Sequence, residues 1–161
     1  MTLELGPLLE PELGVVAGIF GEALRDSHES LAEATLRHGA RLREELARAF
    51  ARILVARVAR APVGALLSWH VADEVHVLDV AVAGSARRRG VGRALVSALL
   101  ASARREGARL VLLEVRTSNS AAISLYGEAG FAPFHVRKGY YLDGEDGLEM
   151  RLELEPANWR L

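Results

Sequence analysis

The sequence predicts an α+β protein built around a central mixed, mostly antiparallel sheet of about six to seven strands, flanked by about four helices. Three observations support this fold class. Short runs rich in Val and Leu follow one another in the middle of the chain, and stretches with helical spacing of apolar residues surround them. One further strand follows a glycine-rich loop and a helix, which predicts a strand–helix–strand crossover and hence two parallel strands.

The composition is that of one domain, expected to span residues 1–161. The chain has 161 residues, 50% of them hydrophobic and 25% charged, so it can bury a core and is not a disordered protein. It contains no cysteine, which excludes disulfides and thiol catalysis. It shows neither a signal peptide nor an apolar run as long as a membrane span, so we expect a soluble, cytoplasmic protein that does not enter a membrane.

The first half of the chain is expected to hold a short extended piece at residues 3–5 and then two helices. The apolar face of the first helix would contain Leu13, Val16, Phe20 and Leu24. The second helix is expected from about Ser30, and Gly39 is a candidate break in it. Its later part would place four apolar residues on one stripe: Leu42, Leu46, Phe50 and Ile53.

An antiparallel meander of three strands is expected next, at residues 53–58, 63–71 and 75–82, with turns at 61–62 and 72–73. A helix from Val91 to about Gly107 follows. The nearly continuous apolar run at 110–115 is typical of a buried parallel strand. Ser118 or Asn119 can cap a further helix that ends near Gly130, and residues 131–137 and 148–154 read as two last strands.

The loop at residues 87–94 is the segment most indicative of function. Its glycines let main-chain N–H groups approach a ligand, and the start of a helix favours an anion. The spacing fits neither a P-loop nor a dinucleotide fingerprint, and leaves the string Arg87-x-x-Gly90-x-Gly92. A basic surface turn is an alternative. Direct contact with nucleic acid is not expected, because the net charge is −1.

This string resembles the acetyl-coenzyme A signature of the GNAT family of N-acetyltransferases. Residues 113–126, with the sequence LEVRTSNSAAISLY, together with Gly130-Phe131 and residues 137–141, are similar to the ribosomal-protein-alanine N-acetyltransferase branch of that family. The similarity runs from about Asp73 to about Leu154, and its motifs agree in type, order and spacing. It implies the GNAT-like α/β variant of the predicted fold and transfer of acetyl from acetyl-CoA to a primary amine.

The resemblance also implies how acetyl-CoA binds. Main-chain amides would hold the diphosphate of the coenzyme at Arg88, Arg89, Gly90, Val91, Gly92 and Arg93. A strand would hydrogen-bond the pantetheine arm through Val80, Ala81 and Val82. Asn119 would reach the cofactor, although a plain helix cap is the more common role for an Asn in this position.

Acetyl transfer to an amine needs a proton acceptor for the amine and a proton donor for the departing thiolate. Glu114 lies near the end of an apolar strand and shares a face with Leu110 and Leu112. Apolar neighbours should raise the pKa of its carboxylate, which suits a general base near neutral pH, although a strand-end carboxylate can simply point into water. Tyr126 can donate a proton, although a lone Tyr is usually a packing residue. The resemblance implies that Glu114 is the proton acceptor and Tyr126 the general acid. A main-chain N–H in residues 80–82 is the expected oxyanion donor.

The acceptor is less clearly indicated. The resemblance implies the N-terminal amine of a protein such as a ribosomal protein, with Tyr140 and Tyr141 contacting the peptide. The Pro-Trp pair expected between the first helices is absent, so a small-molecule amine or amino acid is an alternative acceptor. A coenzyme A-binding module without catalysis is the alternative from another class. The five histidines form no metal-ligand pattern, so no metal is expected. The sequence leaves monomer and homodimer open.

Overall fold

Strands and helices follow one another in the order that the sequence predicts. The computed structural model describes residues 1–155, and residues 156–161 of the expected domain lie outside the described residues. The strands are β1 (Glu4–Pro7), β2 (Ala51–Val58), β3 (Ala61–Val71), β4 (Glu74–Val82), β5 (Leu110–Arg116), β6 (Ala132–Arg137) and β7 (Gly147–Glu153). The helices are α1 (Leu13–Leu24), α2 (Leu31–Leu46), α3 (Val91–Arg105) and α4 (Ser120–Glu128), with short 3-10 turns η1 (Glu10–Glu12) and η2 (Gly84–Ala86).

All seven strands form one sheet in the order β1-β2-β3-β4-β5-β7-β6. The pair β4–β5 is parallel, and the other five pairs are antiparallel. The parallel pair is the one that the α3 crossover connects, as the glycine loop and helix between two strands predict. The predicted fold class, a mixed and mostly antiparallel sheet with four flanking helices, is therefore confirmed for the described residues.

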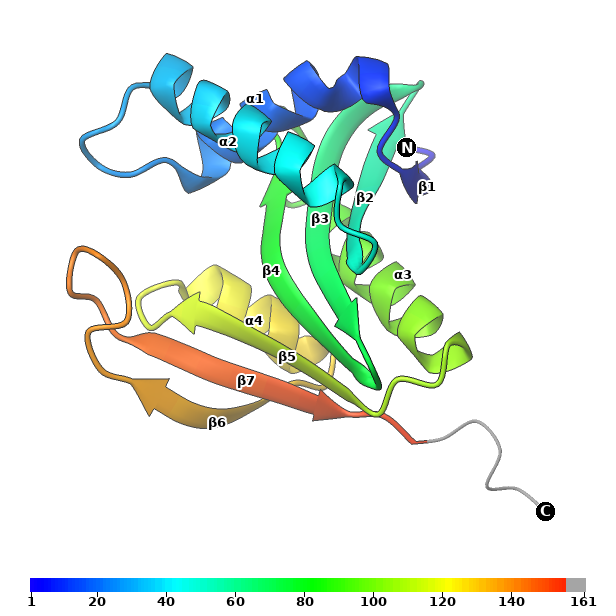
Figure 1. The fold of residues 1–161 in the computed structure, drawn as a ribbon, viewed down its shortest axis with the longest axis vertical. Coiled ribbons are helices and arrows are strands. Elements are labelled where there is room, and N and C mark those ends of the chain that lie inside the picture. Colours follow the sequence, from blue (N-terminus) through cyan, green and yellow to red (C-terminus); the bar gives the residue numbers. More distant parts are fainter. Residues whose placement is uncertain (156–161) are drawn as a thin grey trace.

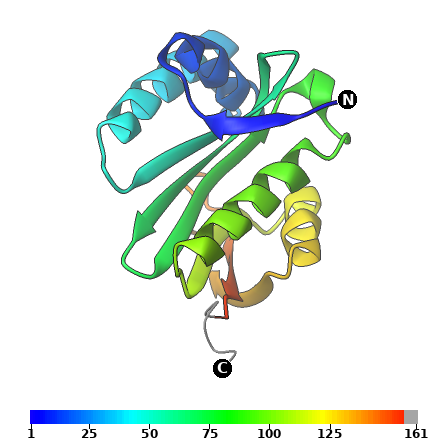
Figure 2. The same ribbon diagram turned by 90° about the vertical axis from the view of Figure 1, so that its right-hand side faces the viewer.

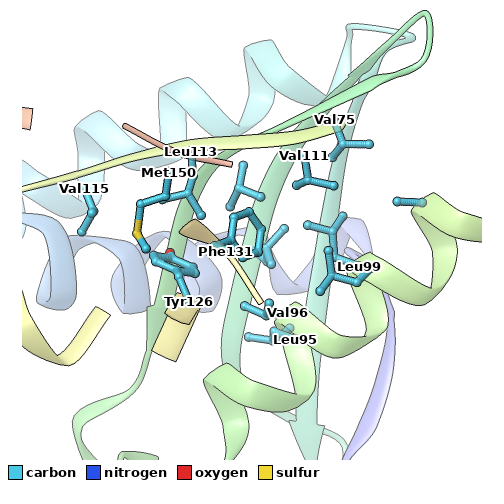
Figure 3. Packing of buried hydrophobic residues seen from close by; sticks show 14 of the residues in the cluster. Val75, Leu95, Val96, Leu99, Val111, Leu113, Val115, Tyr126, Phe131 and Met150 are labelled. Atoms are coloured by element: carbon cyan, nitrogen blue, oxygen red, sulfur yellow. The ribbon is translucent and has the colours of Figure 1, made fainter. Parts of the chain in front are cut away.

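The helices cover the two faces of the sheet in pairs. In Figure 1, α1 and α2 lie on one face, and in Figure 2 α3 and α4 lie together on the other. Each face has its own hydrophobic cluster, which we call the α1–α2 cluster and the α3–α4 cluster. Figure 3 shows the α3–α4 cluster, in which Leu95, Leu113 and Met150 are at most 1% exposed. Full burial of one such side chain contributes roughly 1.5–3 kcal/mol.

Local sequence explains where two of the helices begin. Ser30 caps α2, because its hydroxyl accepts a hydrogen bond from the Glu33 amide while the Glu33 carboxylate accepts one from the Ser30 amide. Asn119 caps α4 through a hydrogen bond from the Ala122 amide to its side-chain oxygen. Within residues 1–155, no side chain caps α3, which begins after Gly90.

The structure corrects three local predictions. Helix α2 continues through Gly39, because a glycine is tolerated inside a helix that packs well on a neighbour. The predicted stripe from Leu42 to Ile53 is wrong: α2 ends at Leu46, and Ile53 belongs to β2. The turn between β2 and β3 lies at Ala59 and Arg60, both with positive φ, while the expected turn residues 61–62 open β3.

None of the helices that the structure describes is both long enough and apolar enough to cross a membrane.

Candidate active site

The parallel strands β4 and β5 separate partway along their length. Their ladder joins Glu74 through Val77 to Leu110 through Leu113. Strand β4 nevertheless continues to Val82 and β5 to Arg116, and Figure 1 shows the two strands diverging toward their ends. We call the diverging segments, residues 78–82 of β4 and 114–116 of β5, the fork.

The fork leaves one edge of β4 without a strand partner, which is where the predicted pantetheine-binding residues lie. Val80, Ala81 and Val82 pair with β3 on one side only. Extended main chain with an open edge can hydrogen-bond an extended ligand as an added strand would. The Val82 carbonyl already accepts a hydrogen bond of 3.2 Å from the Arg87 side chain.

The predicted anion loop lies between the end of β4 and the start of α3. Gly90 adopts a left-handed conformation with φ of 80°, and Arg88 also has a positive φ of 59°. Because no side chain caps α3, the first-turn amides of Val91, Gly92 and Arg93 remain available for an anion. The surrounding charge is positive, since the loop contains Arg87, Arg88 and Arg89 and the first turn of α3 contains Arg93.

Gly92 brings three elements together at this point. A Cβ built on it would lie 3.3 Å from a Leu125 methyl carbon of α4 and 3.9 Å from a Val82 methyl carbon of β4. The start of α3, the end of β4 and one face of α4 therefore converge. A cavity of about 340 Å³ between α3 and α4 opens beside them, lined by Arg93, Val96, Ser97, Leu125, Glu128 and Ala129.

Two predicted cofactor residues use their side chains within the protein. The Arg93 guanidinium donates to the Glu128 carboxylate at 2.7 Å and so links α3 to α4. The Asn119 oxygen accepts the capping hydrogen bond of α4 at 3.1 Å. The Arg93 main-chain amide and the Asn119 side-chain nitrogen are the groups that remain for a ligand.

Tyr126 lies in α4 among the residues of the α3–α4 cluster. It is 7% exposed, and its ring meets Phe131 edge to face with centroids 5.8 Å apart (Figure 3). Burial raises the pKa of Tyr126 to about 12, and the charge of Asp79 and the charge that Tyr141 acquires at high pH act in the same direction. The hydroxyl therefore keeps its proton near neutral pH and is able to donate it.

Glu114 lies at the start of the β5 arm of the fork, on the opposite face from Tyr126's cluster. Its neighbours Leu113 and Val115 belong to the α3–α4 cluster, so alternation directs Glu114 toward the α1–α2 face. The expected apolar surroundings are only partly present. Leu112 shares this face, but the cross-strand partner of Glu114 is Glu149, which pairs with Arg137 at 3.2 Å.

A larger cavity opens on the α1–α2 face of the fork. It measures about 1020 Å³ and lies between the α1–α2 loop and the β6–β7 loop, which Figure 1 shows next to each other. Its lining combines cationic, anionic and aromatic side chains: Arg25, Asp26, Ser27, His28, Glu29, Glu33, Arg37, Arg116, Tyr141, Leu142 and Asp143. We call it the acceptor cavity, after the role that we propose for it.

Of the two predicted substrate-binding tyrosines, Tyr141 lines the acceptor cavity and Tyr140 lies beside it. Their rings meet at right angles with centroids 5.1 Å apart. The Arg116 guanidinium lies 4.1 Å from the Tyr141 ring centroid and is itself paired with Asp143 at 2.7 Å. Burial raises the pKa of Tyr141 to about 12, and the charges of Glu114 and Asp79 act in the same direction.

Sequence reasoning missed Asp79 and its partner Arg41. Arg41 of α2 donates to the Asp79 carboxylate of β4 at 2.5 Å, and the Asp79 side chain is 21% exposed. One signal was present in the sequence, because Asp79 is an acidic residue inside the apolar run VLDVAV. Arg116 was missed as well, and its signal was its position directly after an apolar strand.

No group of three or more His, Asp or Glu side chains within residues 1–155 is arranged to hold a metal ion.

Comparison with known proteins gives concordant matches over about half of the chain. The Escherichia coli (strain K12) [ribosomal protein bS18]-alanine N-acetyltransferase is 40% identical over 87 residues, which are 52% of this chain and 59% of that protein. An N-alpha-acetyltransferase of Sulfurisphaera tokodaii is 44% identical over 80 residues, 49% of this chain and 48% of that one. The matched stretch thus spans only about half the length of these relatives.

The whole fold has a counterpart among solved structures. The crystal structure of the ribosomal-protein-S18-alanine N-acetyltransferase from Escherichia coli superimposes with a TM-score of 0.83 and 25% identity, covering 99% of both chains. The sequence profile of the family described as "Acetyltransferase (GNAT) family" matches residues 19–131, which include the second half of α1, the fork, the uncapped start of α3 and Tyr126. The chain therefore belongs to the GNAT acetyltransferase family, and resembles its ribosomal-protein-alanine N-acetyltransferase branch.

Proposed function

We propose that this protein is an acetyl-CoA-dependent N-acetyltransferase whose acceptor is a primary amine, most specifically the N-terminal α-amine of a protein such as a ribosomal protein. One observation carries the proposal. The fork separates an uncapped helix start with unpaired amides, suited to a diphosphate, from a roomy polar cavity, suited to an acceptor. Two substrates that enter from opposite faces can meet between the arms of the fork.

In this proposal the coenzyme is held mostly by main-chain groups. The amides from Arg88 to Arg93 bind its diphosphate, and the open edge of β4 at residues 80–82 binds its pantetheine arm. Asn119 contributes through its side-chain nitrogen, since its oxygen caps α4. Acetyl-CoA bound in this way supplies an acetyl group activated as a thioester.

The chain's own residues then move two protons. Glu114 accepts a proton from the acceptor ammonium, directly or through water, which leaves a neutral amine able to attack the thioester carbonyl. A C–N bond forms, the nitrogen then gives up its second surplus proton to solvent, and the C–S bond breaks. Tyr126 donates its hydroxyl proton to the departing thiolate, a role that a pKa of about 12 permits near neutral pH. A main-chain N–H of residues 80–82 is the proposed donor to the developing oxyanion.

The acceptor side favours an extended chain over a compact molecule. The acceptor cavity measures about 1020 Å³, at the upper end of the volumes typical of small-molecule sites. Tyr140 and Tyr141 lie at its β6–β7 side, where they can contact a peptide backbone. The mixed charge of the lining supports the alternative, a small-molecule amine or amino acid, because an Arg in the wall could bind a carboxylate.

The test is a screen of acceptors by release of free coenzyme A thiol. We expect turnover with peptides that have a free N-terminal Ala, and little with simple amines. Glu114→Gln and Tyr126→Phe should each lower kcat by about 10²- to 10⁴-fold, the usual contribution of one acid or base. Both should still be stabilised by acetyl-CoA in a thermal melt, because neither residue is proposed to hold the coenzyme.

Each other outcome has a definite meaning. Turnover of small amines alone would favour the alternative acceptor. Stabilisation by acetyl-CoA without turnover of any acceptor would favour a binding module, and full activity of both variants would remove Glu114 and Tyr126 from the mechanism. At 100 times its Kd, a ligand adds about 2.7 kcal/mol to the free energy of unfolding, which a thermal melt detects easily.

A further inference from the structure

Asp79 is a carboxylate at the fork that the proposed proton transfers do not use. It lies on β4, two residues beyond Val77, the last β4 residue paired with β5. Across the sheet it pairs with Leu67 of β3, whose side chain belongs to the α1–α2 cluster. Directly paired residues share a face, so Asp79 faces the side of the sheet on which the acceptor cavity opens.

Asp79 forms an ion pair with helix α2 and interacts electrostatically with two tyrosines. Helix α2 presents Arg41, which contacts one oxygen of the carboxylate at 2.5 Å, together with the charges of Arg37 and Glu45. The Asp79 charge also contributes to the raised pKa of Tyr126 in α4 and to that of Tyr141 in the β6–β7 loop. Burial raises the pKa of Asp79 itself, although Arg41 opposes this shift.

Glu114 faces the same space from the other arm of the fork. Val77 of β4 and Leu113 of β5 form the last pair of the ladder, so Asp79 and Glu114 lie two residues and one residue beyond it, on the same face of the sheet. The fork therefore presents one carboxylate from each strand, and both carboxylates act electrostatically on Tyr141. A carboxylate forms strong charge-assisted hydrogen bonds with an ammonium group, and aromatic faces also attract cations.

We propose that Asp79 binds the ammonium group of the acceptor and positions it beside Glu114. This inference rests on the proposed function and adds a specificity-determining residue to it. Asp79 accepts an N–H hydrogen bond and forms no covalent bond, and the proton that leaves the amine goes to Glu114. In the absence of the acceptor, the ion pair with Arg41 orients the Asp79 carboxylate and opposes its protonation. The acceptor cavity thereby selects for a free, cationic amine.

The experiment measures binding without reaction. Coenzyme A replaces acetyl-CoA, and the affinity for an Ala-initiated peptide with a free amine is compared with that for its N-acetylated form. We expect the wild type to bind the free amine about 10- to 100-fold more tightly, as for a hydrogen bond between charged groups. Asp79→Asn should abolish most of this preference and leave affinity for the acetylated peptide nearly unchanged.

The matched control is Glu12→Gln. Glu12 forms an ion pair with Arg57 at 2.6 Å, in which both side chains are at most 13% exposed, beside β1 and outside the fork. Like Asp79→Asn, Glu12→Gln removes a carboxylate from a partly buried ion pair with an arginine. Any effect of the lost ion pair on folding should therefore appear in both variants. We expect the Glu12→Gln protein to keep the full preference for the free amine.

An unchanged preference in Asp79→Asn would overturn the inference while leaving acetyl transfer by the wild type intact. If Asp79→Asn does not fold, Arg41→Met provides the second test. Loss of the guanidinium favours protonated Asp79. As the pH is lowered, the preference for the free amine should therefore disappear at a higher pH than in the wild type. The same pH midpoint of this loss in both proteins would overturn the inference. If the wild type transfers no acetyl group, the proposed function fails, and the binding comparison still reports on Asp79.

Discussion

At the scale of single residues, His38 makes the packing of α1 on α2 sensitive to pH. It is 3% exposed and stacks on Phe20 with ring centroids 5.7 Å apart. Its Nε2 atom is buried without a hydrogen-bond partner among residues 1–155. Burial, together with the charges of Arg37 and Arg41, lowers the pKa of His38 below its ordinary value of 6.5. The folded protein therefore disfavours the imidazolium form.

The sign of the pH effect follows from this shift. As the pH falls below about 6.5, the unfolded chain binds a proton at His38 before the folded protein does, so the free energy of unfolding decreases. Burial lowers the pKa of His70 too, which adds to the effect, while the raised pKa of Asp79 opposes it. The difference between the wild type and His38→Leu isolates the contribution of His38.

We expect urea denaturation of His38→Leu to show a weaker loss of stability between pH 6.5 and about 5 than the wild type, because one proton-binding group of the unfolded state is gone. His135→Gln, a change on the exposed strand β6, is the control and should follow the wild-type curve. Parallel pH curves for the wild type and His38→Leu would contradict this account of His38.

At the scale of elements, α3 offers a matched pair of glycines. Gly90 precedes its first residue with φ of 80°, and Gly107 follows its end with φ of 81°. A Cβ on either glycine would meet no atom within 4 Å. Replacement by Ala therefore costs conformational strain alone, roughly 1–2 kcal/mol in each case. Only Gly90 adjoins the amides proposed to bind the diphosphate.

This pair separates stability from coenzyme binding. We expect Gly90→Ala and Gly107→Ala to lower the free energy of unfolding by similar amounts. Isothermal titration with acetyl-CoA should then show about 10-fold or greater weakening for Gly90→Ala only, because strain at Gly90 turns the first-turn amides away from their positions. Equal affinity in both variants would argue that the diphosphate binds elsewhere.

At the scale of the whole molecule, the fold class and the order of helices and strands along the chain were predictable because apolar periodicity reflects burial directly. The failures occurred where tertiary contacts outweigh local signals. Ala59 and Arg60 form the β2–β3 turn in left-handed conformations that non-glycine residues rarely adopt, so no turn residue marks the place. Helix α2 ends at Leu46 without a glycine or proline, and the apolar run beyond it resembles a continuation.

The candidate site was predictable only as far as its residues lie close together in sequence. The anion loop is a contiguous motif, and its uncapped helix start follows from the absence of a capping side chain. The roles predicted for Glu114 and Tyr126 came from a resemblance and stay predictions. The contact between Arg41 and Asp79 joins residues 38 positions apart, and no periodicity connects α2 to the middle of β4.

The sheet has two halves that a bound coenzyme should hold together. Strands β1–β4 form one half and β5–β7 the other, and the ladder that begins at Glu74 and ends at Val77 joins them. We expect saturating acetyl-CoA to slow hydrogen exchange of the amides at residues 78–82 and in the first turn of α3, where the ligand is proposed to bind. Core amides in both halves of the sheet exchange through global unfolding. Their exchange rates should fall by about 100-fold when acetyl-CoA is present at 100 times its Kd. The edge strand β6, in which every residue is exposed, exchanges through local opening and should not change. Slowing of core amides without new protection at residues 78–82 would show that acetyl-CoA binds outside the fork.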